Sequence, residues 1–383
     1  MTPDTRHAEI AGAGFGGLVA ALALARRGWS VRVHERNAAL RSEGFGIAIH
    51  RNGVLVLEAL GVLDDVRAKA LKVSFLETRA ADGTPTGRVH PKDTWRMSRQ
   101  HMVEVLARHA RAAGVEIVTG SDVAGADPAG ALLLADGTRL PADLVIGADG
   151  INSRVRETLG LLRRDRTLRD GAFRMVIPRA DHELRYGPEE AAPAYETWSG
   201  QRRIIYNPCG PDEIYIAMTA LNADADATAA PIDVETWAGS FPHLRPLIER
   251  IRADTDWSRV RWAPFRVIEL DAWSQGRAAL IGDAANAMPP NLGQGGGCAM
   301  MNALSLSDFV AGATDIPGGL RAWETSERPL TEHTQRLSRF YSAATNWPPA
   351  LRSLVFSATA RLKPLRDAYQ RTANHVPRGT GHV

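Results

Sequence analysis

The chain has 383 residues, more than one domain usually holds, which predicts two lobes around a large buried core. Hydrophobic residues make up 44% and charged residues 23%, values typical of a folded α/β protein that exclude disordered and fibrous classes. The 46 Lys and Arg and the 43 Asp and Glu leave a formal net charge of +3 and are interspersed, so we expect no nucleic-acid partner.

Cysteine usage and the first apolar run bear on location. Cys209 and Cys298 lie far apart and form no CxxC pair, so neither a disulfide framework nor a metal site is expected. The apolar run at residues 10–24 contains four glycines and precedes Arg26 and Arg27, a pattern that suits neither a signal peptide nor a membrane-spanning helix. We therefore expect a cytoplasmic protein without a membrane partner.

The chain begins with a predicted βαβ unit, made of a strand at 8–11, a helix at 18–27 and a strand at 29–34 that leads to Glu35. Its first turn reads GxGxxG, and Glu35 follows 18 residues after the last motif glycine. The motif glycines are Gly12, Gly14 and Gly17. Such glycines let a pyrophosphate approach the backbone at a helix start, and the acid accepts a ribose hydroxyl. The unit predicts bound FAD or NAD, with an ordinary tight turn as the alternative.

The next segment predicts a loop at 41–51, a helix at 54–60 and two strands within 72–88, joined by an Asp82-Gly83 turn. A helix rich in Arg and His follows at 98–113. Arg99 lies at its start, where the side chain either reaches a phosphate or lies in solvent.

Short strands at 115–119, 131–134 and 137–140 precede a buried strand that ends at Asp149-Gly150. Arg154 and Arg156 follow in the next predicted helix. This arrangement can clasp a second phosphate-bearing group, although Asp-Gly is also a common turn.

Between residues 170 and 265 the pattern changes to alternating strands, which predicts a second lobe with an antiparallel sheet. The strands expected there are 172–177, 194–198, 202–206 and 213–218, followed by helices at 234–241 and from Leu244. The chain then returns to the first lobe through a strand near Ala278.

A dense cluster of turn residues spans Gly282 to Gly297, reading GDAANAMPPNLGQGGG. A strand delivers Asp283 at its carboxyl end, the Pro289-Pro290 pair fixes the backbone, and glycines open a helix through Cys298. A strand-end acid and free N–H groups at a helix start predict a small-molecule site, against the alternative of glycines that serve only tight turns.

These three motifs together resemble those of the class A flavoprotein monooxygenases, the single-component FAD aromatic hydroxylases of the p-hydroxybenzoate hydroxylase type. From Ala8 to about Arg328 the chain is most similar to the hydroxypyridine-carboxylate branch of that family. The resemblance implies an α/β fold in which a Rossmann-like FAD-binding lobe interleaves with an α+β substrate lobe that carries an antiparallel sheet. We expect the FAD lobe at 1–71, 98–169 and 266–345, the substrate lobe at 72–97 and 170–265, and a basic helical tail at 346–383.

The resemblance also implies a cofactor site for tightly but non-covalently bound FAD, with NADH or NADPH as a transient reductant and O₂ as cosubstrate. The residues that would contact FAD are Gly12, Gly14, Gly17, Glu35, Arg36, Arg41, Arg99, Asp149, Gly150, Asp283, Gly293, Gln294, Gly295 and Gly296.

For the substrate, the resemblance implies that Arg203 anchors it, Tyr215 contacts or polarises it, and the Pro290 carbonyl accepts a hydrogen bond from its hydroxyl. From the pattern alone, Arg203 could equally lie on the surface of a sheet and Tyr215 could pack in the core. Asn286 replaces the usual histidine of the family. The residues that replace pocket tyrosines of the pyridine branch are Ala48, Leu76 and Phe265, which makes the pocket more apolar.

The implied activity is hydroxylation of a small aromatic or N-heteroaromatic acid through a flavin C4a-hydroperoxide, with opening of the ring as a further option in pyridine catabolism. Two alternatives remain open at this point. One is a monooxygenase of a larger natural product or drug, and the other is an FAD-binding reductase without oxygenase activity.

Overall fold

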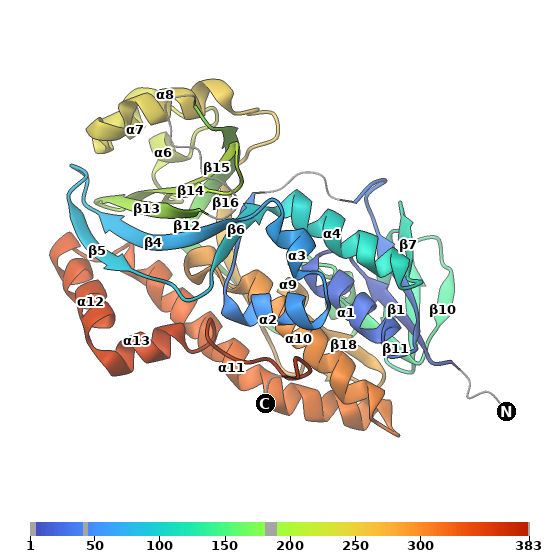
Figure 1. Cartoon of the computed structure of the whole chain (residues 1–383). Helices are drawn as coiled ribbons and strands as arrows, with labels where there is room; N and C mark the ends of the chain where they lie inside the picture. The colour runs from blue at the N-terminus through green and yellow to red at the C-terminus, as the bar shows by residue number, and fades with distance from the viewer. Residues whose placement is uncertain (1–4, 41–44, 181–189, 382–383) are drawn as a thin grey trace.

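The computed structural model describes residues 5–40, 45–180 and 190–381 (Figure 1). A six-stranded sheet has the order β17-β18-β11-β1-β2-β7. Its strands are β1 (His7–Ala11), β2 (Ser30–Glu35), β7 (Glu116–Thr119), β11 (Leu144–Gly147), β17 (Ser274–Gln275) and β18 (Ala278–Leu280). All pairings except that of β17 are parallel, so the predicted glycine motif, Asp149-Gly150 and Asp283 all follow the carboxyl ends of neighbouring strands.

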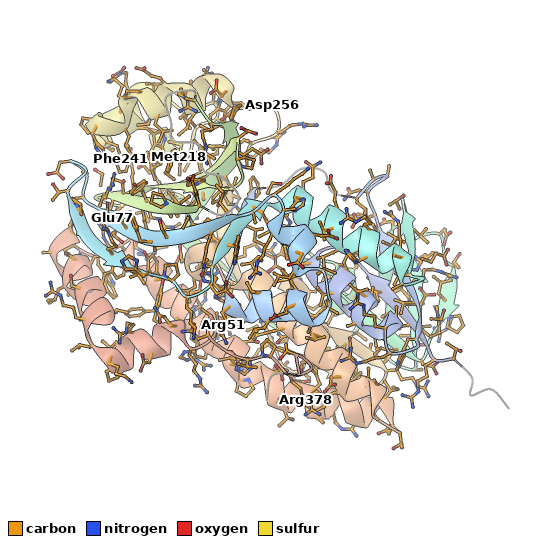
Figure 2. All side chains as sticks on the ribbon, viewed as in Figure 1. Arg51, Glu77, Met218, Phe241, Asp256 and Arg378 are labelled. Carbon is orange, nitrogen blue, oxygen red and sulfur yellow. The ribbon has the colours of Figure 1, made fainter. Side chains whose placement is uncertain are left out.

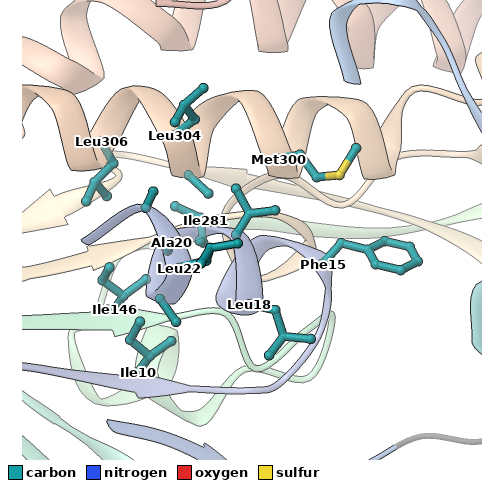
Figure 3. Packing of buried hydrophobic residues seen from close by; sticks show 14 of the residues in the cluster. Ile10, Phe15, Leu18, Ala20, Leu22, Ile146, Ile281, Met300, Leu304 and Leu306 are labelled. Atoms are coloured by element: carbon teal, nitrogen blue, oxygen red, sulfur yellow. The ribbon is translucent and has the colours of Figure 1, made fainter. Parts of the chain in front are cut away.

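Helix α1 (Phe15–Ala25) lies between this sheet and helix α10 (Gly295–Ala311), as Figure 3 shows. Its residues from Phe15 to Leu24 are all buried, because the helix is covered on both sides. Ile10 and Ile146 of the sheet pack beneath it, and Leu304 of α10 packs above it. This packing fixes the first turn of α1 next to the first turn of α10, and both turns carry predicted site glycines.

The remaining elements of this lobe surround that core. Its helices are α2 (Arg51–Ala59), α3 (Leu63–Arg67), α4 (Arg99–Ala112), α5 (Arg154–Thr158), α9 (Asp283–Asn286) and α11 (Ile316–Ala344), with a 3-10 turn, η2, at Pro290–Leu292. A three-stranded antiparallel sheet comprises β8 (Val123–Asp127), β9 (Ala131–Leu134) and β10 (Arg139–Pro141). None of the helices in the described parts of the chain is both long and apolar enough to cross a membrane.

The second lobe is built on a nine-stranded sheet with the order β16-β12-β15-β14-β13-β4-β6-β3, to which β5 is added on β4. The strands are β3 (Gly46–Ile49), β4 (Leu71–Arg79), β5 (Pro85–Val89), β6 (Trp95–Ser98), β12 (Leu162–Pro178), β13 (Ala191–Ser199), β14 (Arg202–Pro208), β15 (Glu213–Leu221) and β16 (Ala263–Leu270). The predicted antiparallel strands pair as expected, whereas β13 and β4 pair in parallel because β4 arrives from an earlier segment.

One face of this sheet is covered by α6 (Ala225–Thr228), α7 (Val234–Ser240), η1 (Pro242–Leu244) and α8 (Arg245–Asp254), seen above the sheet in Figure 1. A second hydrophobic core lies between them and includes Phe173, Met218, Trp237 and Phe241. Met218 and Phe241 are labelled in this layer in Figure 2. The opposite face of the sheet is left to form one wall of a cavity.

The C-terminal segment forms α12 (Pro349–Arg361) and α13 (Lys363–Gln370). Arg352 is buried, whereas the later basic side chains are exposed, namely Arg361, Lys363, Arg366, Arg371 and Arg378. Tyr369, Gln370, Ala373 and Asn374 line the cavity. The Asn52 amide donates to the Ala373 carbonyl at 3.0 Å and so ties the segment to α2.

Three strands of the nine-stranded sheet, β3, β6 and β16, were not expected from the sequence. β3 lies in the segment predicted as a loop, and β16 precedes the predicted return strand. β3, residues 266–270 of β16 and the first half of β12 fall within stretches assigned from the sequence to the FAD lobe. The exact lobe boundaries therefore stay a prediction.

Candidate active site

The three motif glycines have different surroundings. A Cβ atom added to Gly12, whose φ is 99°, would lie 2.3 Å from the Ala148 carbonyl oxygen, and one added to Gly17 would lie 2.0 Å from the Gly12 carbonyl oxygen. A Cβ added to Gly14 would meet no atom within 4 Å. Gly12 and Gly17 thus allow the turn to close on itself, while Gly14 faces open space where a ligand can approach the backbone.

Glu35 lies beside this turn at the end of β2. Its carboxylate accepts hydrogen bonds from the Ala13 amide at 3.2 Å and from Asn37 Nδ2 at 2.6 Å. The acid is therefore held next to the glycine motif, a position from which it could accept a hydrogen bond from a ribose hydroxyl. Arg36 is exposed next to it. Arg41, the other arginine expected near the cofactor, lies outside the described residues.

The second predicted motif places an acid close to the first. Asp149 Oδ2 accepts from the Val155 amide at 3.2 Å, while the buried Oδ1 has no partner. Burial raises the pKa of Asp149, which the hydrogen bonds from Ser153 and Val155 only partly oppose. An uncompensated carboxylate oxygen fits a site built to receive a hydroxyl or N–H donor from a ligand.

Arg99 and Asp283 both line the cavity. The Arg99 guanidinium carbon lies 4.9 Å from the centre of the Phe15 ring, and Arg99 lines the cavity. Asp283 is open to the cavity but sufficiently enclosed for desolvation to raise its pKa, against the opposing charges of Arg99 and Arg174. Asn286, in place of the family histidine, is buried with its Nδ2 unpartnered.

The glycine-rich segment forms the remaining cofactor wall. Gly293 has a left-handed φ of 62°, and a Cβ there would lie 3.1 Å from His50 Nε2. Gln294 Oε1 accepts from Asn52 Nδ2 at 3.0 Å, which ties the segment to α2. Gly295 is open, whereas a Cβ on Gly296 would lie 2.9 Å from Ile47. The first N–H groups of α10 therefore face the cavity as donors to an acceptor or an anion.

A cavity of about 420 Å³ lies between this segment and the nine-stranded sheet. The predicted site residues that line it are Gly14, Arg99, Gly150, Arg203, Tyr215, Asp283, Pro290, Gly293, Gln294, Gly295 and Gly296. Ala48, Leu76 and Phe265, at the positions where the family branch carries tyrosines, line it too. The sequence motifs and the substrate sheet thus meet at one site.

The features above fit FAD: two glycine-lined helix starts, an acid at the end of β2, an unsatisfied Asp149 oxygen and Asp283 at the end of the last parallel strand. The model of the FAD binding domain family matches residues 5–315. The chain belongs to the FAD binding domain family.

Relatives support this family across the whole chain. The 2-heptyl-3-hydroxy-4(1H)-quinolone synthase of Mycobacteroides abscessus is 36% identical over 93% of this chain and 95% of that protein. A Rhodococcus erythropolis protein, to which the same synthase activity is ascribed provisionally, is 40% identical over 99% of both. The structure of 2-methyl-3-hydroxypyridine-5-carboxylic acid oxygenase matches with a TM-score of 0.85 and 36% identity over 97% of both chains.

The enzyme is thus a flavoprotein of the aromatic-hydroxylase type that consumes NAD(P)H and O₂. This excludes the alternative of a reductase without oxygenase activity that the sequence left open. The residue assignments within the site and the identity of the substrate stay predictions.

The substrate wall shows Arg203 in a different setting from that expected. Its side chain is 2% exposed and donates to Thr219 Oγ1 at 2.9 Å, Asn291 Oδ1 at 2.9 Å and Glu196 Oε1 at 3.1 Å. Three of the five guanidinium N–H groups are therefore engaged, and Glu196 balances the charge. A substrate carboxylate at Arg203 would compete with this internal ion pair.

Tyr215 and Pro290 line the cavity as expected, on opposite walls. Tyr215 lies on β15, and burial raises the pKa of its phenol even though Arg174, Arg203 and Arg96 are close. The phenol is therefore protonated near neutral pH and can donate a hydrogen bond. Pro290 begins η2 directly before the glycine-rich turn.

Several cavity-lining side chains were not predicted from the sequence, among them Arg96, His50 and Arg174. Arg96 projects from β6 and His50 follows β3, and neither short strand was predicted. Arg174 lies on β12, a predicted strand, and its guanidinium carbon is 4.8 Å from the centre of the Phe45 ring. The alternating pattern around Arg174 could have shown which face of the sheet it occupies, but not that this face meets the cofactor lobe.

Proposed function

We propose that the enzyme hydroxylates an N-heteroaromatic ring that carries a ring oxygen and an apolar substituent, as in a 2-alkyl-4(1H)-quinolone. The observation that carries this proposal is the wall of the cavity. Val73, Leu76, Val89, Ile205 and Phe265 form an apolar surface, beside which arginines offer donors to a ring oxygen. Such a mixture suits a flat ring with one polar edge.

The names of two relatives support the same chemistry. A 2-heptyl-3-hydroxy-4(1H)-quinolone synthase is a monooxygenase whose product carries a hydroxyl on carbon 3, next to the ring carbonyl. The corresponding reaction in this chain would place oxygen on carbon 3 of a 2-alkyl-4(1H)-quinolone. The alkyl chain would lie against the apolar wall, where burial of each methylene contributes about 0.8 kcal/mol.

In the proposed reaction the bound FAD supplies the oxidising chemistry when reduced by NAD(P)H in the presence of O₂. The chain's part is to hold the ring between the nine-stranded sheet and the glycine-rich segment. The N–H groups at the start of α10 would face the cofactor and stabilise negative charge on it. The Pro290 carbonyl would accept a hydrogen bond from the substrate, and the C-terminal residues around Tyr369 would limit access of water.

A hydroxypyridine carboxylic acid is the second candidate substrate. One observation favours it: the cavity is lined by Arg96, Arg99, Arg174, Arg203 and Lys92, against only Glu196 and Asp283. This excess of positive charge would attract an acid. The replacement of tyrosines by Ala48, Leu76 and Phe265 favours the quinolone, since it removes hydroxyl groups that a small polar ring would need.

The deciding experiment measures NADH and NADPH oxidation by the FAD-loaded protein with 2-heptyl-4(1H)-quinolone, 2-methyl-4(1H)-quinolone and a 3-hydroxypyridine-5-carboxylic acid. We expect the heptyl compound to stimulate oxidation most, and its product to carry one labelled atom when the reaction is run under isotope-labelled O₂. Stimulation by the pyridine acid alone would contradict the quinolone proposal, and product without label would contradict ring hydroxylation.

A further inference from the structure

The cavity wall contains a buried cation for which no carboxylate partner is found among the described residues. Arg96 is 8% exposed, its Nη1 donates to Asn207 Oδ1, and its buried Nε has no hydrogen-bond partner. Burial lowers the pKa of Arg96 to about 10, opposed only by Cys209 and Tyr215. A buried charge is costly without a counter-charge, so this guanidinium is incompletely satisfied within the described chain.

Arg203 provides a contrast on the same wall. The two arginines are comparably buried, but Arg203 forms an ion pair with Glu196 at 3.1 Å, and Glu196 also accepts from Tyr341 Oη at 2.7 Å. The net charge of this cluster is compensated inside the protein. An anionic ligand group therefore gains less binding free energy beside a guanidinium that is already paired with a carboxylate than beside one that has no such partner.

Arg96 and two of its neighbours form a polar corner of the cavity. The polar corner consists of Arg96, Asn207 and Tyr215. Arg96 is paired with Ala48 across β6 and β3, and Asn207 is paired with Tyr215 across β14 and β15. A Cβ on Gly46 would lie 2.5 Å from Tyr215 Cβ, so β3 packs tightly on this corner. All three residues of the polar corner line the cavity.

Two other titratable groups near Arg96 are uncharged near neutral pH, whereas Arg174 adds positive charge beside Tyr215. Burial and the charge of Arg96 lower the pKa of His50 to about 4, and burial raises the pKa of the Cys209 thiol to about 12. His50 approaches the flavin-facing turn at Gly293. The polar corner is thus positively charged, and His50 lies between it and the turn at Gly293.

We propose that the polar corner binds the ring oxygen of the substrate, with Arg96 as the specificity-determining residue and Arg203 as a structural cation of the sheet. This inference rests on the proposed function. It applies to an oxygen that bears negative charge, such as a phenolate or the carbonyl oxygen of a 4-quinolone, whose charge is increased by conjugation with the ring nitrogen. Donation by Arg96 and Tyr215 would orient the ring and favour its electron-rich form.

The test compares the quinolone with the corresponding quinoline, which lacks this oxygen and also the proton on the ring nitrogen. The FAD-loaded protein is titrated with 2-heptyl-4(1H)-quinolone and with 2-heptylquinoline, which lacks the oxygen, and binding is followed by the flavin absorbance spectrum. For Arg96→Met we expect the Kd of the quinolone to rise about ten- to hundredfold, because a hydrogen bond to a charged group is lost, and that of the quinoline to change less than about twofold. Arg96→Lys should restore part of the difference.

Two further variants separate a direct contact from a structural effect. Arg203→Met should lower the thermal stability and weaken both ligands to a similar degree, because it removes the partner of Glu196. Arg245→Met changes an exposed arginine on α8, beyond the far side of the sheet, and should leave both affinities unchanged.

The outcomes are distinguishable from a failure of the proposed function. Two outcomes would overturn the role of Arg96 while the quinolone remains the substrate. One is that Arg96→Met raises the Kd of both ligands equally, and the other is that Arg203→Met selectively raises the Kd of the quinolone. A wild-type protein that binds neither compound would overturn the proposed substrate class, and the inference with it.

Discussion

At the scale of single residues, glycines that share one motif serve different purposes. A Cβ atom on Gly12 would lie 2.3 Å from a backbone oxygen atom, and one on Gly17 would lie 2.0 Å from another. The fold itself therefore needs glycine at both positions. Gly14 has no protein atom near its missing side chain and is needed only when a ligand is present. The motif letters do not show this difference, whereas the structure does.

This difference leads to a prediction for Gly14→Ala. The backbone there is extended, at φ −81°, so alanine is accommodated and the melting temperature of the FAD-free protein should fall by only a few degrees, with a contribution from the poorer N-cap. The affinity for FAD should fall about tenfold or more, because the methyl group occupies the approach to the pyrophosphate. Fluorescence titration with FAD measures this change.

Gly87→Ala is the matched control, since Gly87 is exposed on β5 and a Cβ there also meets no atom. It should leave the affinity for FAD unchanged. Unaltered FAD binding in Gly14→Ala would show that the pyrophosphate does not pass this glycine.

The positions of residues at strand ends and helix starts could be predicted from the sequence, whereas their contacts with FAD stay a prediction. Gly14, Asp283 and the turn from Gly293 lie where a strand end or a helix start requires them, and these signals are local. The setting of Arg203 and of Arg96 was not predictable in the same way. One has an acid nearby and the other does not, and that depends on how β6, β13 and β14 are placed by the fold.

At the scale of elements, the alternating pattern identified the central strands but not the short or outlying ones. β3 has four residues and follows a glycine-rich stretch, so its extended conformation is set by pairing with β6 and not by its own sequence. β12 is longer than predicted, since its polar first half alternates poorly yet pairs with β16. Pairing with distant strands therefore sets the extent of β3 and β12, which the local sequence pattern did not show.

The cover formed by α7 and α8 gives a prediction at this scale. Phe241 is fully buried in the core between these helices and the nine-stranded sheet, and stacks on Trp237 at a centroid distance of 6.2 Å. Phe241→Ala should lower the free energy of unfolding by about 3–5 kcal/mol. Because this core is separate from the one around α1, the folded variant should still bind one FAD per chain.

Urea unfolding and the ratio of flavin to protein absorbance test both parts. Phe340→Ala removes a phenylalanine that is 48% exposed and should cost much less stability. Loss of FAD from folded Phe241→Ala would show that the two cores are coupled.

At the scale of the whole molecule, the cavity exists only because distant segments converge on it. Its walls come from the first turn of α1, from strands of the nine-stranded sheet, from the segment before α10 and from the residues around Tyr369 near the C-terminus. The contribution of the C-terminal segment to the cavity wall was not predicted, because its sequence shows basic residues with apolar ones between them and no site motif. A wall built from so many segments couples the environment of a cavity residue to the folding of the entire chain.

His50 makes that coupling measurable as a pH dependence. Burial and the nearby charge of Arg96 lower its pKa to about 4 in the folded state, against 6.5 for an unperturbed histidine. Between these values the unfolded chain binds more protons, so the stability that comes from a neutral His50 is complete above pH 6.5 and is lost as the pH falls towards 4. His50→Asn should therefore lose less stability than the wild type between pH 7.5 and 5, as judged by the midpoint of urea unfolding at each pH.

The control is His243→Asn, a change at an exposed histidine, whose stability should decline with falling pH as that of the wild type does. An identical decline in His50→Asn would contradict the burial of a neutral imidazole at the cavity, and with it the view that Arg96 is the principal charge in the polar corner.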